Sequence, residues 1–328
     1  MFRLYIKYRS LLMPNRILLT SSLALFVFAT SVSAQQMPTP ETDEIVRRAS
    51  TQMLAYVETF KNLLSQETKT FETYDRDGDV KKRRVVRSTF IVYQLSKDPD
   101  KITEYRNVFS VDGKDLARTD ARAQDFFEKL VRVESSAKEL ENIQDESLRF
   151  DQEIYISNLT LFQSVALSEP VRPSFDFKYA GSETIEGRRV YVLDYRQIAA
   201  SPNVAIGAPT GDGKPGLRYD VDLDGLKNLN ERLSGKFWID AETFQIVREH
   251  RVLTIQPEGF EARVPVSENW FEFQKSTFGI LTPKRISHLQ FDVDKKKRTS
   301  VKGVQVVFEY DRFTRPDVDV KASDVKQP

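Results

Sequence analysis

The chain has 328 residues, with 49 basic and 48 acidic side chains and no cysteine. Without cysteine the protein has no disulfide, no thiolate nucleophile and no lipid-modified cysteine. The balanced charge argues against a nucleic-acid partner, which needs a concentrated excess of lysine and arginine. Stability must come from a packed core, and the length suffices for one large domain or two small ones.

Residues 1–34 have the layout of a secretory signal peptide. Basic residues precede an apolar run at 17–32, and small residues precede Gln35: Arg3, Lys7, Arg9 and Arg16, then Ser33 and Ala34. The run is shorter than the ~20 residues of a membrane-spanning helix, which favours cleavage over an uncleaved anchor. We therefore expect a periplasmic protein, with a net charge near −3 because the leader removes four basic residues. Met13 opens a shorter form of this signal and is an alternative start.

The first half of the mature chain is predicted to contain helices and a meander of strands. The segment 41–65 places apolar residues at helical spacing: Ile45, Ala49, Met53, Tyr56, Phe60 and Leu63. From Gln66 the period changes to two, which predicts strands at 66–75, 82–95 and 102–110. A second amphipathic helix is predicted at 120–143, with Thr119 or Asp120 as its cap.

After Pro173 the pattern is that of strands joined by short turns. Strands are predicted at 175–179, 188–196, 236–240, 245–255, 268–275, 280–293 and 301–313. About ten strands with short connections imply antiparallel pairing. The predicted fold class is α+β, a single domain over 35–328 in which two or three helices cover a large curved antiparallel sheet, a half-barrel. The stretch 199–234 is predicted to be an insertion.

Such a sheet either fills its hollow with its own side chains or leaves an apolar cavity for a ligand. The candidate ligand-binding residues are apolar and lie on the later strands: Phe175, Phe177, Tyr179, Val192, Trp238, Trp270, Phe271 and Phe273. For any one of these side chains, core packing is the alternative to ligand contact.

Parts of this pattern resemble the LolA-like superfamily, which contains periplasmic lipoprotein carriers and sensor domains similar to MucB and RseB. These parts are the hairpin at 179–193 with its turn at Gly187, the strand and turn at 235–243, and the N-terminal order of signal, helix and hairpin. The resemblance implies an apolar cavity that acyl chains enter, under a lid formed by the helices at 41–65 and 120–143. The stretch 199–234 is longer than the carriers' usual connection, and no position matches the arginine of their lid latch.

The sequence offers little for catalysis. Only two histidines are present, His250 and His288, both in predicted strands, and no G-x-S-x-G motif occurs. A serine triad would have to use one of these imidazoles, and we expect both to be structural. We therefore expect no enzyme, and a hydrolase with a carboxylate pair in a cleft is only the third hypothesis.

One local motif fits a calcium-binding loop. The pattern D-x-D-x-D-G-x5-E supplies side-chain oxygens and one carbonyl oxygen, from Asp220, Asp222, Asp224, Leu226, Asn228 and Glu231. Calcium takes about six to eight oxygen ligands, and Gly225 permits the sharp bend between them. The alternative is a strand that runs into a short helix capped by Asp224. We expect no other cofactor.

Two hypotheses emerge for the function. The first is a non-enzymatic protein of outer-membrane biogenesis that holds a lipid or a lipoprotein acyl chain in the half-barrel and stays peripheral to the membrane. The second is a partner-binding or sensory module of the cell envelope, of the same fold but without a bound lipid. The size and the lining of the hollow separate the two.

Overall fold

The computed structural model describes residues 40–117, 121–151, 159–162, 164–199, 204–206, 217–219 and 230–316. The chain divides into two units between Thr39 and Pro40, and the first unit, with the predicted signal peptide and Met13, lies outside the described residues. Most of the predicted insertion at 199–234 lies outside them as well. Every described residue therefore belongs to the second unit.

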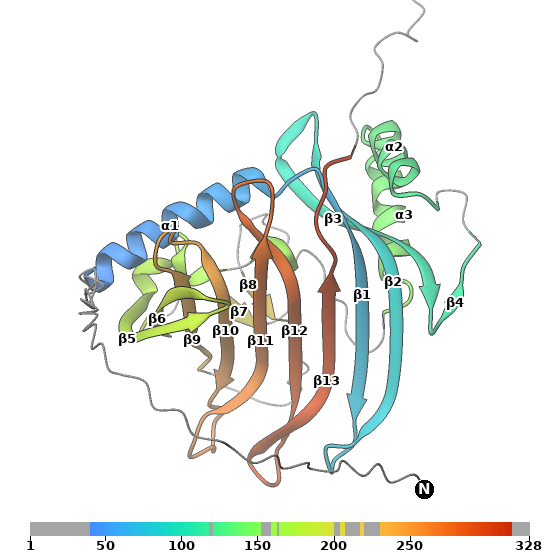
Figure 1. Ribbon diagram of the computed structural model, residues 1–328. Helices are drawn as coiled ribbons and strands as arrows, with labels where there is room; N and C mark the ends of the chain where they lie inside the picture. Colours follow the sequence, from blue (N-terminus) through green and yellow to red (C-terminus); the bar gives the residue numbers. More distant parts are fainter. Residues whose placement is uncertain are drawn as a thin grey trace, which may run out of the picture. The chain divides into compact units, whose positions relative to one another are not determined.

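Eleven strands form one curved antiparallel sheet in the order β4-β3-β2-β1-β13-β12-β11-β10-β9-β6-β5 (Figure 1). The strands are β1 (Leu63–Tyr74), β2 (Val80–Leu95), β3 (Asp98–Val111), β4 (Lys114–Asp115), β5 (Phe175–Ile185), β6 (Arg188–Gln197), β9 (Arg232–Asp240), β10 (Ile246–Ile255), β11 (Val264–Lys275), β12 (Leu281–Asp294) and β13 (Thr299–Tyr310). A separate parallel pair consists of β7 (Val204–Ile206) and β8 (Leu217–Tyr219). The predicted α+β class with one large, open antiparallel sheet is confirmed, with eleven strands in place of about ten.

The turns between these strands follow from their residues. Asp75 Oδ1 accepts hydrogen bonds from the backbone N–H groups of Asp77 and Asp79, and Gly78 has a φ of +88° between β1 and β2. Asp240 Oδ1 accepts in the same way from the N–H groups of Glu242 and Thr243 between β9 and β10. Short side chains that bind nearby backbone favour tight reversals, which is why consecutive strands pair with one another.

The two faces of the sheet differ in their cover. We call the inner face the side that carries a row of directly paired residues running from β1 to β6: Lys69, Phe308, Ile286, Phe271, Glu249, Phe237 and Leu193. Helix α1 (Thr42–Thr59) lies on this face, because the ring of its Tyr56 contacts that of Phe273. The predicted helix continued to residue 65. It ends at Thr59 because the chain turns through Asn62, at a φ of +52°, into β1.

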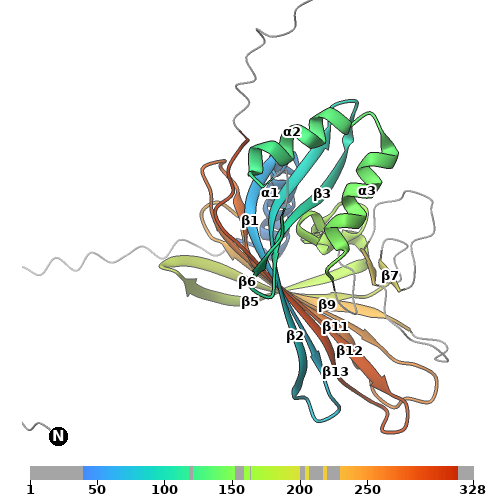
Figure 2. The ribbon, with the colours of Figure 1, turned by 90° about the vertical axis from the view of Figure 1, so that its right-hand side faces the viewer.

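The second predicted helix is two helices, and they lie elsewhere than the resemblance implies. Ser136 accepts a hydrogen bond from the backbone N–H of Glu139 and starts α3 (Ala137–Leu148) directly after α2 (Ala123–Val133). Both helices pack against Ile91, Tyr93 and Tyr105, which alternate along the strands with inner-face residues and so point to the outer face. These helices are therefore not a lid over the inner face. Figure 2 shows both of them beside β3.

Helix α3 also covers a free strand edge. The Ser147 hydroxyl donates to the carbonyl oxygen of Arg106 and accepts from its N–H, both at 2.9 Å. An unpaired edge strand is a template for unwanted pairing, so this contact closes part of the β3 edge. No helix among the described residues is long and apolar enough to cross a membrane.

A connecting segment crosses the inner face between α3 and β5. We call the described residues of 150–174 the strap; they include the short 3-10 helices η1 (Leu159–Phe162), η2 (Val165–Leu167) and η3 (Arg172–Ser174). The strap is joined to α1 by two hydrogen bonds, from the Ser50 hydroxyl to the Leu167 carbonyl and from the Tyr56 hydroxyl to the Thr160 carbonyl. The strap and α1 thus form one cover over the inner face.

Candidate functional site

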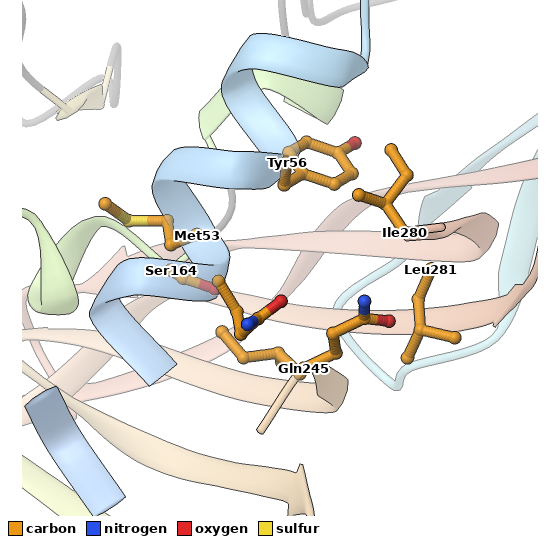
Figure 3. Close-up of a pocket in the computed structure, with 8 residues that line it drawn as sticks. Met53, Tyr56, Ser164, Gln245, Ile280 and Leu281 are labelled. Carbon is orange, nitrogen blue, oxygen red and sulfur yellow. The ribbon is translucent and has the colours of Figure 1, made fainter. Parts of the chain in front are cut away.

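A pocket lies at one end of the sheet, beneath α1 (Figure 3). Its volume is about 300 Å³ including the open mouth. Eight residues line it, from α1, from the strap, and from the turns before β10 and β12 with the first residue of each strand: Gln52, Met53, Tyr56, Ser164, Gln245, Ile246, Ile280 and Leu281. Among these described lining residues none is charged, five are apolar or aromatic, and two carry neutral carboxamides.

Helix α1 is held over the pocket by aromatic contacts. The Tyr56 ring stacks on Phe60 with centroids 4.7 Å apart, and Phe60 meets Phe313 edge to face at 5.1 Å. The buried surface of α1 continues along one side of the helix through Ile45, Ala49 and Met53. Spacings of three and four residues place these side chains on one face. Burial and the nearby charge of Glu104 hold the pKa of Tyr56 well above its usual value, so its hydroxyl stays a hydrogen-bond donor.

A cluster of buried charges lies on the inner face beside the pocket. Arg106 donates to Glu67 from Nε at 2.8 Å and from Nη2 at 2.9 Å, and its Nη2 also donates to Glu104 at 3.0 Å. Glu104 accepts from the backbone N–H of Thr160 in the strap at 2.7 Å. All three charged side chains are at most 1% exposed. Their hydrogen bonds offset part of the cost of burying charge, and they fasten the strap to β3.

Lys69 and Asp151 add a second buried ion pair to this cluster. Burial lowers the pKa of Lys69, helped by the positive charge of Arg106, and burial raises the pKa of Asp151. Each shift is toward the neutral form, as expected where water is excluded. Asp151 lies at the start of the strap, just after α3, so this pair attaches the start of the strap to β1.

The strap is fastened a third time at Glu249 on β10. One oxygen of this carboxylate accepts from the backbone N–H of Ser164 at 2.8 Å, and the other accepts from the Tyr195 hydroxyl at 2.9 Å. Arg251 donates to both oxygens at 2.9 and 3.0 Å, and both side chains are at most 1% exposed. A buried carboxylate thus fixes the backbone of Ser164 at the wall of the pocket.

The eight predicted ligand-binding residues are divided between the two faces. The inner face carries five of them, Phe175, Phe177, Tyr179, Phe271 and Phe273, and the outer face carries Val192, Trp238 and Trp270. The eight side chains therefore do not all face one hollow, because adjacent residues of a strand such as Trp270 and Phe271 point to opposite sides. Their contact with a ligand stays a prediction. None of the eight is among the pocket-lining residues. Phe273 is one contact away, against Tyr56.

The two tryptophans form a polar-aromatic strip on the outer face. Trp270 stacks on His250 at 4.1 Å and lies 5.9 Å from Trp238, centroid to centroid. The indole N–H groups donate to Glu268 and Glu183, respectively. Tryptophan buries a large surface while its N–H keeps a partner. This strip packs the outer face of the strands that carry the pocket-side turns.

The predicted calcium ligands Asp220, Asp222, Asp224, Leu226 and Asn228 lie outside the described residues. Glu231 is described and half-buried just before β9, where its carbonyl oxygen accepts from Arg232. Within the part of the chain that the structure describes, no group of three or more acidic, histidine or cysteine side chains is placed to hold a metal ion. Calcium binding stays a prediction.

The two histidines lie on opposite faces of the sheet, on the two strands that flank β11. His250 contacts Glu268 through Nε2 at 2.8 Å on the outer face. His288 pairs with Val306 and Asn269 on the inner face, and its Nδ1 lies 2.7 Å from the Asn269 side-chain oxygen. That contact assigns the hydrogen of the neutral ring to Nδ1.

Burial lowers the pKa of His288 to about 4. Above pH ~6.5 the ring is neutral in both states, and between ~6.5 and 4 the unfolded chain takes up a proton that the folded chain refuses. We expect the free energy of unfolding to fall by up to about 3 kcal/mol as the pH drops through this window. In urea titrations, His288→Gln should lose this pH dependence and His250→Gln should keep it. A proton-NMR titration that places the His288 pKa near its ordinary value would contradict the expectation.

Sequence reasoning missed the charged groups of the inner face and Ser164. The sequence does contain a pattern that marks the buried charges. Three strands carry an acid and a base two residues apart, on the same side of the strand as buried apolar residues. Leu63 and Phe71 flank Glu67 and Lys69 in this way, and Val247 and Leu253 flank Glu249 and Arg251. For Ser164 the sequence carries no such signal.

No protein-family model and no curated protein matches the chain. Several solved structures do match it. A DUF1329 family protein from Desulfovibrio piger is 13% identical, with a TM-score of 0.34 over 87% of this chain and 96% of that one. A putative outer membrane lipoprotein-sorting protein domain from Vibrio parahaemolyticus is 8% identical, with a TM-score of 0.35 over 87% and 97%.

A LolA superfamily protein from Nitrosomonas europaea is also among the matches. It is 10% identical, with a TM-score of 0.29 over 85% of this chain and 96% of that one. The superfamily that the sequence resembles is thus represented among these structures. At such identities and TM-scores the likeness carries no argument about a ligand or an activity, which must come from the site itself.

Proposed function

We propose that the protein is a non-enzymatic binding protein of the periplasm that takes a slim apolar group, such as a single acyl chain, into the pocket beneath α1. The observation that carries the proposal is the pocket's lining, which combines Met53, Tyr56, Ile246, Ile280 and Leu281 with three neutral polar side chains. Ligand sites are typically concave and mostly apolar with a few polar groups, and their volumes run from ~300 to 1,000 Å³. The volume of about 300 Å³ includes the open mouth, so the enclosed part of this pocket is well below that range and suits only a slim group.

The rest of the described inner face argues for a small ligand at the end of the sheet and against a long acyl chain across its middle. Large aromatic side chains such as Phe90, Phe271 and Phe308 are at most 1% exposed there. The buried charges of Glu67, Arg106 and Glu249 lie among these aromatic side chains. An acyl chain beside them offers no hydrogen bond, so it would gain little binding free energy there. A longer ligand would require α1 to move outward, since α1 forms one wall of the pocket.

We expect saturable binding of the neutral apolar dye N-phenyl-1-naphthylamine, read as a rise in its fluorescence. Met53→Trp places a larger side chain on the pocket side of α1 and should weaken binding at least ~10-fold. Val57→Trp is the matched control, because Val57 lies on the same helix and is 40% exposed. Ile280→Phe narrows the pocket from the opposite wall and repeats the test if Met53→Trp unfolds.

No saturable dye binding, together with no copurified lipid in mass spectra of the native protein, would contradict the proposal. That result would instead favour the second candidate, a partner-binding module of the cell envelope. The filled inner face favours this candidate, because the strap and α1 are fastened to the sheet by a buried ion pair, by hydrogen bonds to buried carboxylates and by an aromatic contact. A crosslinked envelope protein recovered with the intact chain would then be the supporting result.

A further inference from the structure

Ser164 combines burial, backbone strain and an unused hydroxyl. The residue is 0% exposed and lies in the strap at the wall of the pocket (Figure 3). Its φ of +57° and ψ of +31° are left-handed, a region that residues other than glycine rarely adopt. Among the residues that the structure describes, its Oγ has no hydrogen-bond partner.

The backbone N–H and carbonyl groups of Ser164, by contrast, both have hydrogen-bond partners. Its N–H donates to Glu249 at 2.8 Å, and its carbonyl oxygen accepts from the N–H of Leu167 at 2.8 Å. Glu249 is in turn held by Tyr195 and Arg251. The surroundings therefore impose the strained conformation on Ser164, and this conformation sets the position of its hydroxyl. Strain that the surroundings maintain, next to an unpaired polar atom, indicates a functional position.

We infer that Ser164 is a specificity-determining residue of this pocket, and that it selects apolar ligands carrying an uncharged carbonyl group, such as an ester or an amide, over hydrocarbons and over carboxylates. The inference rests on the proposed function. Ser164 is enclosed while the pocket is empty, so its hydroxyl donates to the ligand's carbonyl oxygen once the ligand has displaced the side chains that cover it, while Met53, Ile280 and Leu281 contact the apolar part.

The preference for a neutral group follows from the lining. Gln52 and Gln245 offer carboxamides, and none of the eight described lining residues supplies a cation. A carboxylate would lose its hydration without a counter-ion, and an alkane would gain no hydrogen bond from the Ser164 hydroxyl. An ester or amide avoids the first cost and gains the hydrogen bond, because its carbonyl needs only a donor.

The test is displacement of N-phenyl-1-naphthylamine from the full-length protein by methyl decanoate, decanamide, decanoate and decane. In the wild-type chain we expect the ester and the amide to compete about five-fold better than decane, the worth of one net hydrogen bond. Decanoate at pH 8 should be the weakest of the three carbonyl compounds.

Ser164→Gly removes the hydroxyl and suits the left-handed backbone, so it should reduce the affinity for the ester and the amide about five-fold and leave decane unchanged. Ser168→Ala is the matched control in the same strap, because the Ser168 hydroxyl donates to the Val165 carbonyl instead. Equal competition by all four compounds in the wild type, or an unchanged ester preference in Ser164→Gly, would show that a water molecule satisfies the hydroxyl and would overturn the inference. Absent dye binding in the wild type would overturn the proposed function instead.

Discussion

Replacing Arg106 by methionine is expected to lower the free energy of unfolding by about 3 to 5 kcal/mol. Methionine keeps the length of the side chain over the Phe90 ring, which the guanidinium contacts at 4.8 Å. It removes the three hydrogen bonds to Glu67 and Glu104, whose side chains are 0% exposed. Two buried carboxylates would then lack the cation between them. Urea unfolding monitored by circular dichroism measures the change.

The matched control is Arg122→Met at the start of α2. Arg122 forms an equally short ion pair with Asp125, but its side chain is 81% exposed. Exposed pairs contribute little because water competes for both charges, so we expect a far smaller change in the free energy of unfolding than for Arg106→Met. If both variants lost equally little stability, the cluster around Arg106 would have to be hydrated, and the strap would not depend on it.

The alternation of apolar residues predicted the later strands well, and it failed where polar residues point inward. Between β9 and β13 the predicted strands match the observed ones to within a few residues, since Phe237, Phe271 and Phe308 mark the inner face clearly. In β1 the inward positions include Ser65, Glu67 and Lys69. The helical prediction therefore ran on to residue 65, past the true start of the strand at Leu63.

The position of a helix in the fold is harder to predict than its existence. The apolar stripe of 120–143 is real, but a stripe does not say which face of a sheet it will cover. Tyr93 decides the matter: its hydroxyl donates to Glu134 at 2.7 Å, and its ring meets Phe127, so α2 packs on the outer face. Sequence reasoning placed this helix by resemblance, and the resemblance gave the wrong face.

The candidate site itself was outside the reach of periodicity. Its walls come from a helix, a strap and two turns, and only tertiary structure brings Gln245 next to Ile280 and Ser164. Ligand contacts were predicted for aromatic residues in strands, yet the structure packs these aromatic side chains against one another and against the core. The buried acids and bases that hold the cover in place could have been recognised, because a charge in phase with leucine and phenylalanine must find a partner.

Glu249 is the residue on which the cover and the pocket both depend, and Glu249→Leu is expected to destabilise the protein by about 3 to 5 kcal/mol. The substitution removes the acceptor of the Ser164 N–H, of the Tyr195 hydroxyl and of Arg251 at once. Freed from this acceptor, the strap should open more often, which amide hydrogen exchange at Ser164 would record as lost protection. Dye binding should weaken as well, because Ser164 forms part of the pocket.

The matched control is Glu268→Leu on the outer face, where the carboxylate is 30% exposed beside His250. This variant should leave both the hydrogen exchange of the Ser164 amide and the binding of the dye unaffected. Unchanged exchange at Ser164 in Glu249→Leu would mean that the remaining contacts of the strap, with α1 and with Glu104 and Lys69, hold it in place.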